Sequence, residues 1–560
     1  MKRLFPILLS LLFLCGCSSP AAPSVTETAP VPEPAPSIHT SDEIPYESRF
    51  KNETVIRLVD TGMDITGPNS LTVFGSHDII YYEDRDTYDS GNPYGEGEAA
   101  DKHTAQEAEG HYVVNITEPG TYRVTGKLSA GQIRVDLGED AYEDETAVVE
   151  LILDNADITC TVAPAILFLN VYECDGNWDK DTAKPDVDTS SAGANLILEG
   201  ENTVTGAYVA KIFKDKDGEK KLWKQDGAIY SYMSMNVFGP GALTLNAANE
   251  GMDTELHLTV NGGNITILSG NDGINTNEDG VSVTTINSGN LHIVAGLGAE
   301  GDGIDSNGYL VIHGGTVISA AKPQSDAGLD SDLGSFIHGG TVVALGAAMD
   351  WAESDSEQVT MNLQFSEAQT GPISIQTESG DEVFSFDPAA DAVLKEYGRH
   401  YQGLILSSPN FRVGDSYTVT VDRVPMAYAS TDVMHGPGGF GLNPPGGFGG
   451  DGLGIPEGWK PADGARPEKP EGPEGEMPSF PSGEMPVPPE GGFAGQEPPE
   501  GFGGEMPTWA EGEMPTPPAG SFGQGHRGNR NPGDVSAGAG STVFYMMDKV
   551  NFFSGITPAE

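Results

Sequence analysis

The sequence predicts an all-β protein whose main part is a parallel β-helix, a chain wound into stacked coils of short strands. Three observations support this: a recurring short phrase, glycine pairs between its copies, and apolar residues that alternate along the segments around them. The phrase reads glycine, apolar residue, Asp or Asn, then Ser or Thr, and its copies begin at Gly251, Gly273, Gly303 and Gly328. A period in the twenties of residues is typical of proteins that lay down one structural unit per repeat. The same side chain is therefore expected once per coil.

The glycine pairs and the alternating residues define the strands and turns of each coil. Pairs stand at 262–263, 314–315 and 339–340, and they supply the positive φ that tight turns need. Leu258 and Val260 alternate with polar residues, a period of two that marks a strand with one buried face. The glycine density argues against helices, and the fixed leucine frame of leucine-rich repeats is missing. Weaker copies extend toward the N-terminus, so we place the β-helix at residues 111–348.

The remaining segments are expected to close the two ends of the β-helix. Residues 46–110 are predicted to form an N-terminal cap or first coil region. Short alternating segments predict a small antiparallel β-domain at 349–431, which covers an open sheet edge. Residues 432–540 are rich in Gly, Pro, Glu and Met without periodicity, which predicts a disordered insertion. The apolar stretch 541–560 would be prone to aggregation if exposed, so we expect it to return to the β-domain as a strand.

The N-terminus carries the features of an export signal. Three residues with two positive charges precede an apolar stretch from Leu4 to Leu14, which is too short to span a bilayer. The sequence Leu14-Cys15-Gly16-Cys17 resembles a bacterial lipobox, so residues 1–17 are predicted to be a lipoprotein signal peptide with Cys17 as the lipidated residue. An ordinary cleaved signal is the alternative. Residues 18–45 would then be a disordered tether, and the protein would be exported and lipid-anchored to the outer face of a bacterial membrane, at the cell surface.

The charge of the chain limits its partners. The 560 residues carry a formal net charge of −54 at pH 7, which argues against nucleic acid and against anionic membrane surfaces. Contact with a membrane is expected only through the lipid anchor. The acidity favours cations, or ligands that are neutral or bridged by a cation. Export permits a disulfide between Cys160 and Cys174, but two separate buried thiols are slightly favoured, and the sequence leaves the choice open.

Acidic residues recur at fixed places in the phrase and would form a ladder on one face. Coils of parallel strands stack about 4.8 Å apart. Calcium takes oxygen ligands at about 2.3–2.6 Å, so one ion can join two ligands up to about 5 Å apart, whereas magnesium requires a tighter octahedron. The alternative is a solvated row in which each Asp or Asn bonds its own backbone. The predicted Ca²⁺ ligands are Glu250, Asp253, Asp272, Asn275, Asp302, Asp305, Asp326, Asp330 and Asp332.

Several of these phrases resemble one known family. They are the Asp-Gly-Ile-Asp-Ser sequence at 302–306, the Ile-His-Gly-Gly-Thr-Val sequence at 312–317, Glu-Pro-Gly-Thr-Tyr at 118–122 and Ser-Ser-Pro-Asn-Phe at 407–411. The chain resembles the carbohydrate-binding β-helix proteins of clostridial cell surfaces over roughly residues 111–425. The resemblance implies a right-handed parallel β-helix similar to polysaccharide lyase family 9, binding of cellulose and pectic acids, and bound calcium. It places calcium candidates at Asp272, Asp302 and Asp326.

Three functions follow as hypotheses. The leading one is a surface-anchored, non-catalytic, calcium-dependent protein that binds polysaccharides of plant cell walls, such as pectic acid or cellulose. The alternative is a calcium-dependent lyase that cleaves uronates by β-elimination, with Lys322 as the candidate base. The third is a structural surface adhesin. Trp178, Trp223 and Tyr230 are candidate platforms for sugar stacking or, equally, core or loop residues.

Overall fold

The described part of the chain is nearly all β, as the sequence predicts. This computed structural model describes residues 44–82, 101–216, 219–323, 325–347, 350–433 and 540–559. Within these ranges one α-helix, α1 (Ala105–Glu109), and two 3-10 turns at Ala141–Glu143 and Leu394–Glu396 accompany the strands. None of the helices described here has the length and apolar character that crossing a membrane requires.

Some of the predicted segments lie outside the described residues. These are the signal peptide with Cys17 and nearly all of the segments 18–45 and 432–540.

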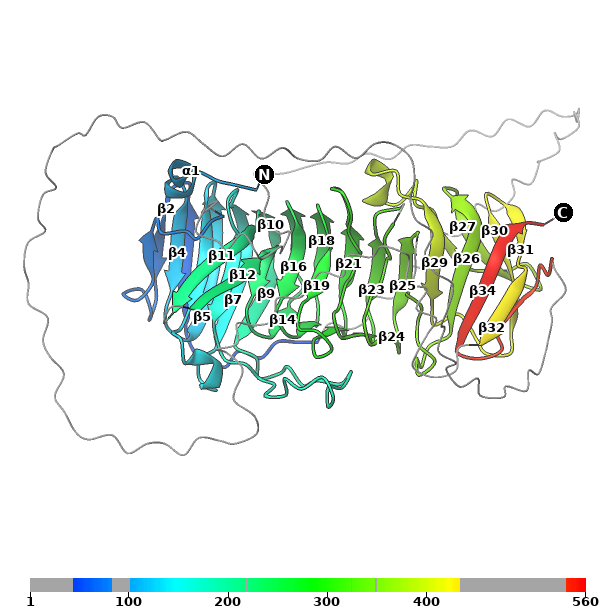
Figure 1. Ribbon diagram of the computed structural model, residues 1–560, viewed down its shortest axis with the longest axis horizontal. Coiled ribbons are helices and arrows are strands. Elements are labelled where there is room, and N and C mark those ends of the chain that lie inside the picture. Colours follow the sequence, from blue (N-terminus) through cyan, green and yellow to red (C-terminus); the bar gives the residue numbers. More distant parts are fainter. Residues whose placement is uncertain are drawn as a thin grey trace, which may run out of the picture.

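Most strands belong to three columns that run along one axis (Figure 1). The first column is a seven-stranded sheet of β3 (Phe74–Ser76), β4 (Tyr112–Ile116), β6 (Gly131–Asp136), β8 (Ile166–Asn170), β13 (Gly227–Ser231), β16 (Glu250–Thr254) and β19 (Ile274–Thr276). The second column holds the first half of β7 (Val149–Thr159), β9 (Ala194–Glu199), β14 (Met235–Phe238), β17 (Leu258–Val260), β20 (Val283–Ile286), β22 (Tyr309–Ile312) and β24 (Gly334–Ile337). The third holds the second half of β7, β10 (Glu201–Gly206), β15 (Ala242–Ala247), β18 (Asn264–Ser269), β21 (Asn290–Val294), β23 (Thr316–Ala320) and β25 (Thr341–Gly346).

The chain visits the three columns in turn and then starts the next layer. β13, β14 and β15 form one layer, and β16, β17 and β18 form the next. Each strand of the second layer pairs in parallel with the corresponding strand of the first. Beyond β19 the first column continues only as single bridges, Ile274 to Ile304 and Ile304 to Leu329. The register therefore places the copies of the recurring phrase directly on one another.

Three further strands and a hairpin complete the first half of the molecule. β5 (Gly120–Leu128) pairs in parallel with β7 on one side and with β1 (Glu53–Val59) on the other, and β2 (Gly62–Thr66) pairs antiparallel with β1. β11 (Val209–Lys216) and β12 (Glu219–Gln225) form an antiparallel hairpin. β1, β2 and β5 thus lie at the N-terminal end of the stack.

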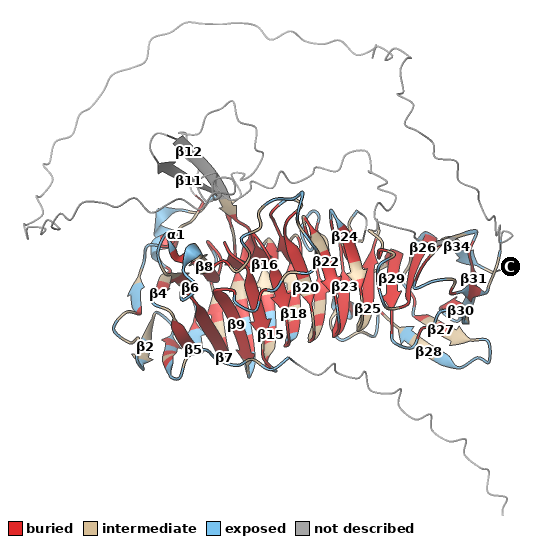
Figure 2. Ribbon diagram, turned by 90° about the horizontal axis from the view of Figure 1, so that it is seen from below, coloured by how far each residue is buried: buried red, intermediate tan, exposed pale blue. Residues whose placement is uncertain are grey.

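Buried residues make up most of the strands of the columns (Figure 2), and their apolar side chains form one large cluster. In β15, Leu243 and Leu245 are buried while Thr244 between them is exposed, which is the alternation expected of a strand with one buried face. The apolar residue of the phrase is fully buried in every copy, at Met252, Ile274, Ile304 and Leu329. One residue of the phrase therefore builds the core while its neighbour carries the charge.

The first glycine of the phrase allows successive layers to approach closely. A Cβ built on Gly251 would lie 2.3 Å from the carbonyl oxygen of Gly273. One built on Gly273 would lie 2.5 Å from that of Gly303, and one on Gly303 2.4 Å from that of Gly328. Real Cβ atoms do not come that close to a backbone oxygen, so this column accepts only glycine. The second glycines of the pairs serve the turns instead, with φ of 96° at Gly263 and 86° at Gly340.

We expect Gly273→Ala to destabilise the protein by about 1–3 kcal/mol, because the new methyl group would push against both the Gly303 carbonyl and the Ile293 side chain. Urea unfolding gives the measurement. Gly176→Ala is the matched control, since a Cβ on Gly176 meets nothing within 4 Å. Equal unfolding midpoints for the two variants would show that the layers are not packed as closely as described.

Nine strands cover the C-terminal end of the stack. They are β26 (Thr360–Gln369), β27 (Ile373–Thr377), β28 (Glu382–Phe386), β29 (Tyr401–Ser407), β30 (Ser416–Val421), β31 (Val424–Ala427), β32 (Ser430–Val433), β33 (Phe544–Tyr545) and β34 (Val550–Pro558). β29 pairs antiparallel with β25, so the large sheet of the stack continues into this region. Arg399 donates from Nη1 to the Ala321 carbonyl oxygen, 2.9 Å away, and from Nη2 to that of Ala295, which ties this region to the last layers.

The pairing of β34 adds a parallel partner to an otherwise antiparallel region. Within residues 360–427 the pairs β26–β29, β27–β28, β27–β30 and β30–β31 are antiparallel. β34 follows the segment 434–539 in the chain and pairs in parallel with β26, and antiparallel with β31 and β32. The sequence predicts the return of a strand here but carries no prediction of its direction. A hairpin-like alternation of short strands does not reveal that a distant strand enters in the same direction as β26.

Candidate functional site

Carboxylate and amide side chains follow the first column from layer to layer and form an acidic row. Asp253 is the register partner of Asn275 in the β16–β19 pair. The bridges through Ile274, Ile304 and Leu329 carry the same register onward, so Asp305 and Asp330 continue the row. Parallel layers lie about 4.8 Å apart, which sets the spacing of these side chains.

The N-terminal end of this row is a buried carboxylate triad of Asp226, Glu250 and Asp253. One oxygen from each residue lies within 4.8 Å of the others. The three residues are 5%, 3% and 0% exposed. Oε2 of Glu250 and Oδ2 of Asp253 have no hydrogen-bond partner, while Oδ1 of Asp253 accepts from Asn277 Nδ2 at 2.7 Å. Buried carboxylate oxygens without a donor are costly, which is the arrangement expected where a bound cation, or a proton shared between Glu250 and Asp253, supplies the missing contact.

The triad carries more negative charge than its neighbouring cation can balance. The ammonium group of Lys224 lies 2.7 Å from Oδ2 of Asp226, so one positive charge faces three carboxylates. Burial, together with the charge of Asp226, raises the pKa of Glu250 to about 7. Burial and the neighbouring Glu250 raise the pKa of Asp253 well above its usual range. Asp226 is not among the ligands predicted from the sequence, although the pair Asp226-Gly227 repeats the acidic residue before glycine that is seen at Asp272 and Asp302.

The row opens toward solvent at its other end. Asp302, Asp305, Asp330 and Asp350 are partly exposed, in contrast to the triad. Burial, followed by the charge of Asp330, raises the pKa of Asp305 well above its usual range and that of Asp350 to about 7. Oδ1 of Asp330 and Oδ2 of Asp350 both accept from the backbone N–H of Ser331, at 2.9 and 3.1 Å. Like Asp226, Asp350 is not among the ligands predicted from the sequence. It follows the last copy of the phrase, so the repeat does not reveal it.

The residues that precede the glycines have a structural role as well. Oδ1 of Asp272 accepts from the backbone N–H of Asp302 at 2.7 Å, and Oδ1 of Asp302 accepts from that of Ala327 at 2.6 Å. Each carboxylate thus bonds the next layer. Asp326 is shifted by one residue from this register, and its Oδ2 accepts from Gly301 and Ser325.

The nine predicted ligands therefore fall into four groups. Glu250 and Asp253 meet in the triad, and Asn275, Asp305 and Asp330 continue the row. Asp272 and Asp302 bond backbone groups beside it, and Asp326 and Asp332 lie at its margin, with Asp332 exposed.

The candidate base and the candidate sugar platforms make contacts that do not indicate a role in binding or catalysis. Lys322 donates from Nζ to the backbone oxygen of Gly298. Tyr230 is fully buried and its hydroxyl donates to Glu255, so it is a core residue and not a platform for sugars. Trp178 packs against Leu256 and Val281.

Two other expectations from the sequence concern Trp223 and the two cysteines of the described part of the chain. The Trp223 side chain lies outside the described part of the structure. Cys160 and Cys174 are both free thiols, so they do not form the disulfide that the sequence left open.

The raised pKa values predict an unusual pH dependence of stability when divalent cations are removed. The pKa values of Glu250 and Asp350 are about 7, against ordinary values of 4.5 and 3.8. Between these limits the folded state binds protons that the unfolded state has released, so the free energy of unfolding falls as pH rises through this window. In EGTA we expect a higher melting temperature at about pH 5.5 than at about pH 7.5. A melting temperature that rises with pH over this range would contradict the described burial of the row.

Comparisons with known proteins bear on the same region. Residues 110–385 match a family described as carbohydrate-binding domain-containing protein. The match covers just under half of the chain and contains the triad and the rest of the acidic row.

Two known proteins are similar to parts of the chain. A carbohydrate-binding domain-containing protein of Acetivibrio thermocellus is 30% identical over 155 residues, which cover 28% of this chain and 44% of that protein. The alignment thus spans less than half of that relative. A solved structure described as the polysaccharide lyase-like protein from C. thermocellum, in a gadolinium derivative, is 23% identical. It covers 52% of this chain and 93% of that chain, with a TM-score of 0.30.

Proposed function

We propose that this protein is a surface-anchored, non-catalytic polysaccharide-binding protein that depends on Ca²⁺. The observation that carries the proposal is the buried carboxylate triad, which lies within the region matched by a carbohydrate-binding family. The three columns would be the faces of a right-handed parallel β-helix, as the resemblance to clostridial surface proteins implies. The lipid on Cys17 would hold the protein at the outer face of the membrane.

The donor set of the row favours calcium over other metals. Its atoms are carboxylate oxygens and the amide oxygen of Asn275, whose Oδ1 is buried without a hydrogen-bond partner. Such hard oxygen donors suit Ca²⁺, whereas the imidazole and thiolate ligands typical of zinc are not part of the triad. The three ligand oxygens lie within 4.8 Å of one another, which is close enough for each to bond one ion at about 2.3–2.6 Å.

The two ends of the row would have different roles. At the closed end, Asp226, Glu250 and Asp253 would hold an ion between adjacent layers. At the open end, Asp305 and Asp330 would leave coordination positions that a ligand can fill. A uronate carboxylate is an oxygen donor of the right charge for that position, and the ion would offset its repulsion by a protein of net charge −54. Pectic acid is therefore the polysaccharide that this end fits best.

Sedimentation with insoluble, calcium-free polygalacturonate tests this function. We expect the protein to bind in calcium and to be released by EGTA, and we expect Asp305→Asn to weaken binding while Asp381→Asn, an exposed change in the C-terminal region, leaves it intact. Binding that is unaffected by EGTA would contradict a calcium bridge.

The lyase alternative is tested in the same reaction. Elimination would create an unsaturated product that absorbs ultraviolet light, and Lys322 would have to leave the Gly298 carbonyl to act as a base. We expect no rise in absorbance with polygalacturonate and calcium. A rise that Lys322→Ala abolishes would replace the binding proposal with the lyase.

A further inference from the structure

A second, chemically different pocket lies on the outer face of the large sheet, away from the acidic row. It has a volume of about 560 Å³, within the range of about 300–1,000 Å³ that is usual for small-ligand pockets. Its floor comes from β5, β7 and β9, where Arg123, Ile152 and Ile197 are successive register partners. One wall comes from the segment 45–53 that precedes and begins β1.

Two sets of contacts hold the wall in place. Glu150, fully buried, accepts from Ser48 Oγ at 2.6 Å and from the backbone N–H of Arg49 at 2.7 Å. Earlier in the same segment the Tyr46 ring packs on Phe238, with centroids 4.7 Å apart. Because these contacts fix the segment against the sheet, the pocket is preformed.

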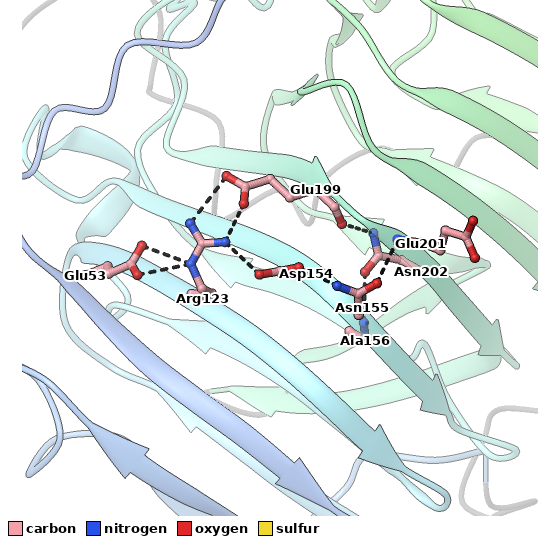
Figure 3. A network of polar contacts seen from close by, with 8 residues as sticks. All are labelled: Glu53, Arg123, Asp154, Asn155, Ala156, Glu199, Glu201 and Asn202. Atoms are coloured by element: carbon pink, nitrogen blue, oxygen red, sulfur yellow. Dashed lines mark hydrogen bonds and ion pairs between the residues drawn. The ribbon is translucent and has the colours of Figure 1, made fainter. Parts of the chain in front are cut away.

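A cluster around Arg123 forms the polar side of the pocket (Figure 3). Nε of Arg123 donates to Glu53 at 3.0 Å, and its Nη atoms donate to Asp154 and Glu199. The guanidinium is therefore occupied by protein carboxylates. The side chains of Glu53 and Glu199 are 40% and 42% exposed. Their carboxylates therefore keep lone pairs that face solvent and can accept hydrogen bonds.

The pocket thus combines the apolar side chains of Ile152 and Ile197, the rings of Tyr46 and Phe50, and carboxylate acceptors. Pyranose rings present the matching surfaces, since their C–H faces pack on apolar and aromatic side chains while their hydroxyl groups donate to carboxylates. Three carboxylates, Glu53, Glu150 and Glu199, line the pocket against two cations, Arg123 and Lys51. This balance disfavours an anionic sugar, because the guanidinium of Arg123 is already held by protein carboxylates, which leaves the single positive charge of Lys51 against a net negative lining.

We infer that this pocket binds a neutral sugar segment of a polysaccharide, independently of calcium. The inference rests on the carbohydrate-binding part of the proposed function but not on its metal. The molecule would then have two binding places of opposite preference. The acidic row would take uronates through Ca²⁺, and the pocket would take neutral units directly.

Titration calorimetry on the full chain in EGTA tests the inference. The probes are cellohexaose, xylohexaose and mannohexaose as neutral hexasaccharides, and hexagalacturonate as the anionic one. We expect saturable binding of at least one neutral probe and none of hexagalacturonate. Absence of binding by all three neutral probes, or tighter binding of hexagalacturonate, would overturn the inference.

Two variants assign the binding to this pocket. Tyr46→Ala removes an aromatic wall, and we expect it to weaken binding of the neutral probe at least about tenfold. Glu199→Gln keeps the shape but removes a charged acceptor and is expected to weaken it too, which provides a second answer if Tyr46→Ala fails to fold. Tyr545→Ala, which removes a 47% exposed ring elsewhere, is the control. Wild-type affinity in both pocket variants would overturn the assignment.

The outcome is separable from that of the calcium proposal. If neutral probes fail but polygalacturonate binds in calcium, the pocket inference falls and the proposed function stands. If neutral probes bind in EGTA but polygalacturonate shows no calcium dependence, the pocket stands and the calcium bridge falls.

Discussion

Adding Ca²⁺ to chelator-treated protein is expected to raise its melting temperature by several degrees. An ion that binds only the folded state stabilises it by RT ln(1 + [L]/Kd), which is about 2.7 kcal/mol at a concentration of 100 Kd. The buried triad gives the reason: its carboxylates repel one another, and oxygens of Glu250 and Asp253 lack partners. Differential scanning calorimetry in calcium and in EGTA measures the shift.

A single substitution should remove most of that response. Asp253→Asn keeps the shape of the side chain but deletes one of the three charges, so we expect the variant to be at least as stable as the wild type in EGTA and to gain little from calcium. Asp381→Asn, an exposed change far along the chain, is expected to respond as the wild type does. A full calcium shift in Asp253→Asn would place the ion elsewhere.

Phe553→Ala is expected to cost about 3–5 kcal/mol of stability, the usual effect of removing a buried aromatic ring. Phe553 lies on β34 and is fully buried. Its ring meets Tyr428 and Phe544 edge-on, with centroids 5.0 and 4.9 Å apart. The three rings join strands from both sides of the segment 434–539, so their loss should open the C-terminal core.

Chemical unfolding followed by limited proteolysis measures this effect. The control is Tyr545→Ala on the neighbouring strand β33, where the ring is 47% exposed and its loss should be nearly neutral. If Phe553→Ala were as stable as Tyr545→Ala, β34 would not be part of the core.

The features that depend on a local repeat were predictable from the sequence. The all-β class follows from glycine density and alternation, and the buried residue of the phrase at Met252, Ile274, Ile304 and Leu329 follows from the period. The acidic row follows too, because a residue that recurs at the same place in each layer must line up with its copies. The role of the first glycine was not evident, since close approach of Gly273 to the Gly303 carbonyl depends on the layer above.

Features that join distant segments could not be read from the repeat. Asp226 enters the triad from an imperfect copy of the phrase, and Asp350 joins the row after the last copy. The pocket at Arg123 exists only because the segment 45–53 crosses strands that lie far away in sequence. The parallel pairing of β34 with β26 likewise reflects where the chain returns after residue 539, not any local pattern.

Titration of Ca²⁺ into chelator-treated protein, followed by isothermal calorimetry, tests the central claim most directly. Metal binding to carboxylates whose pKa values are raised should release protons, so the heat should change with the ionisation enthalpy of the buffer. We predict saturable binding with that buffer dependence in the wild type and loss of the tightest site in Asp253→Asn. No saturable heat in the wild type, or an unchanged titration in Asp253→Asn, would contradict the assignment of the acidic row as a calcium site.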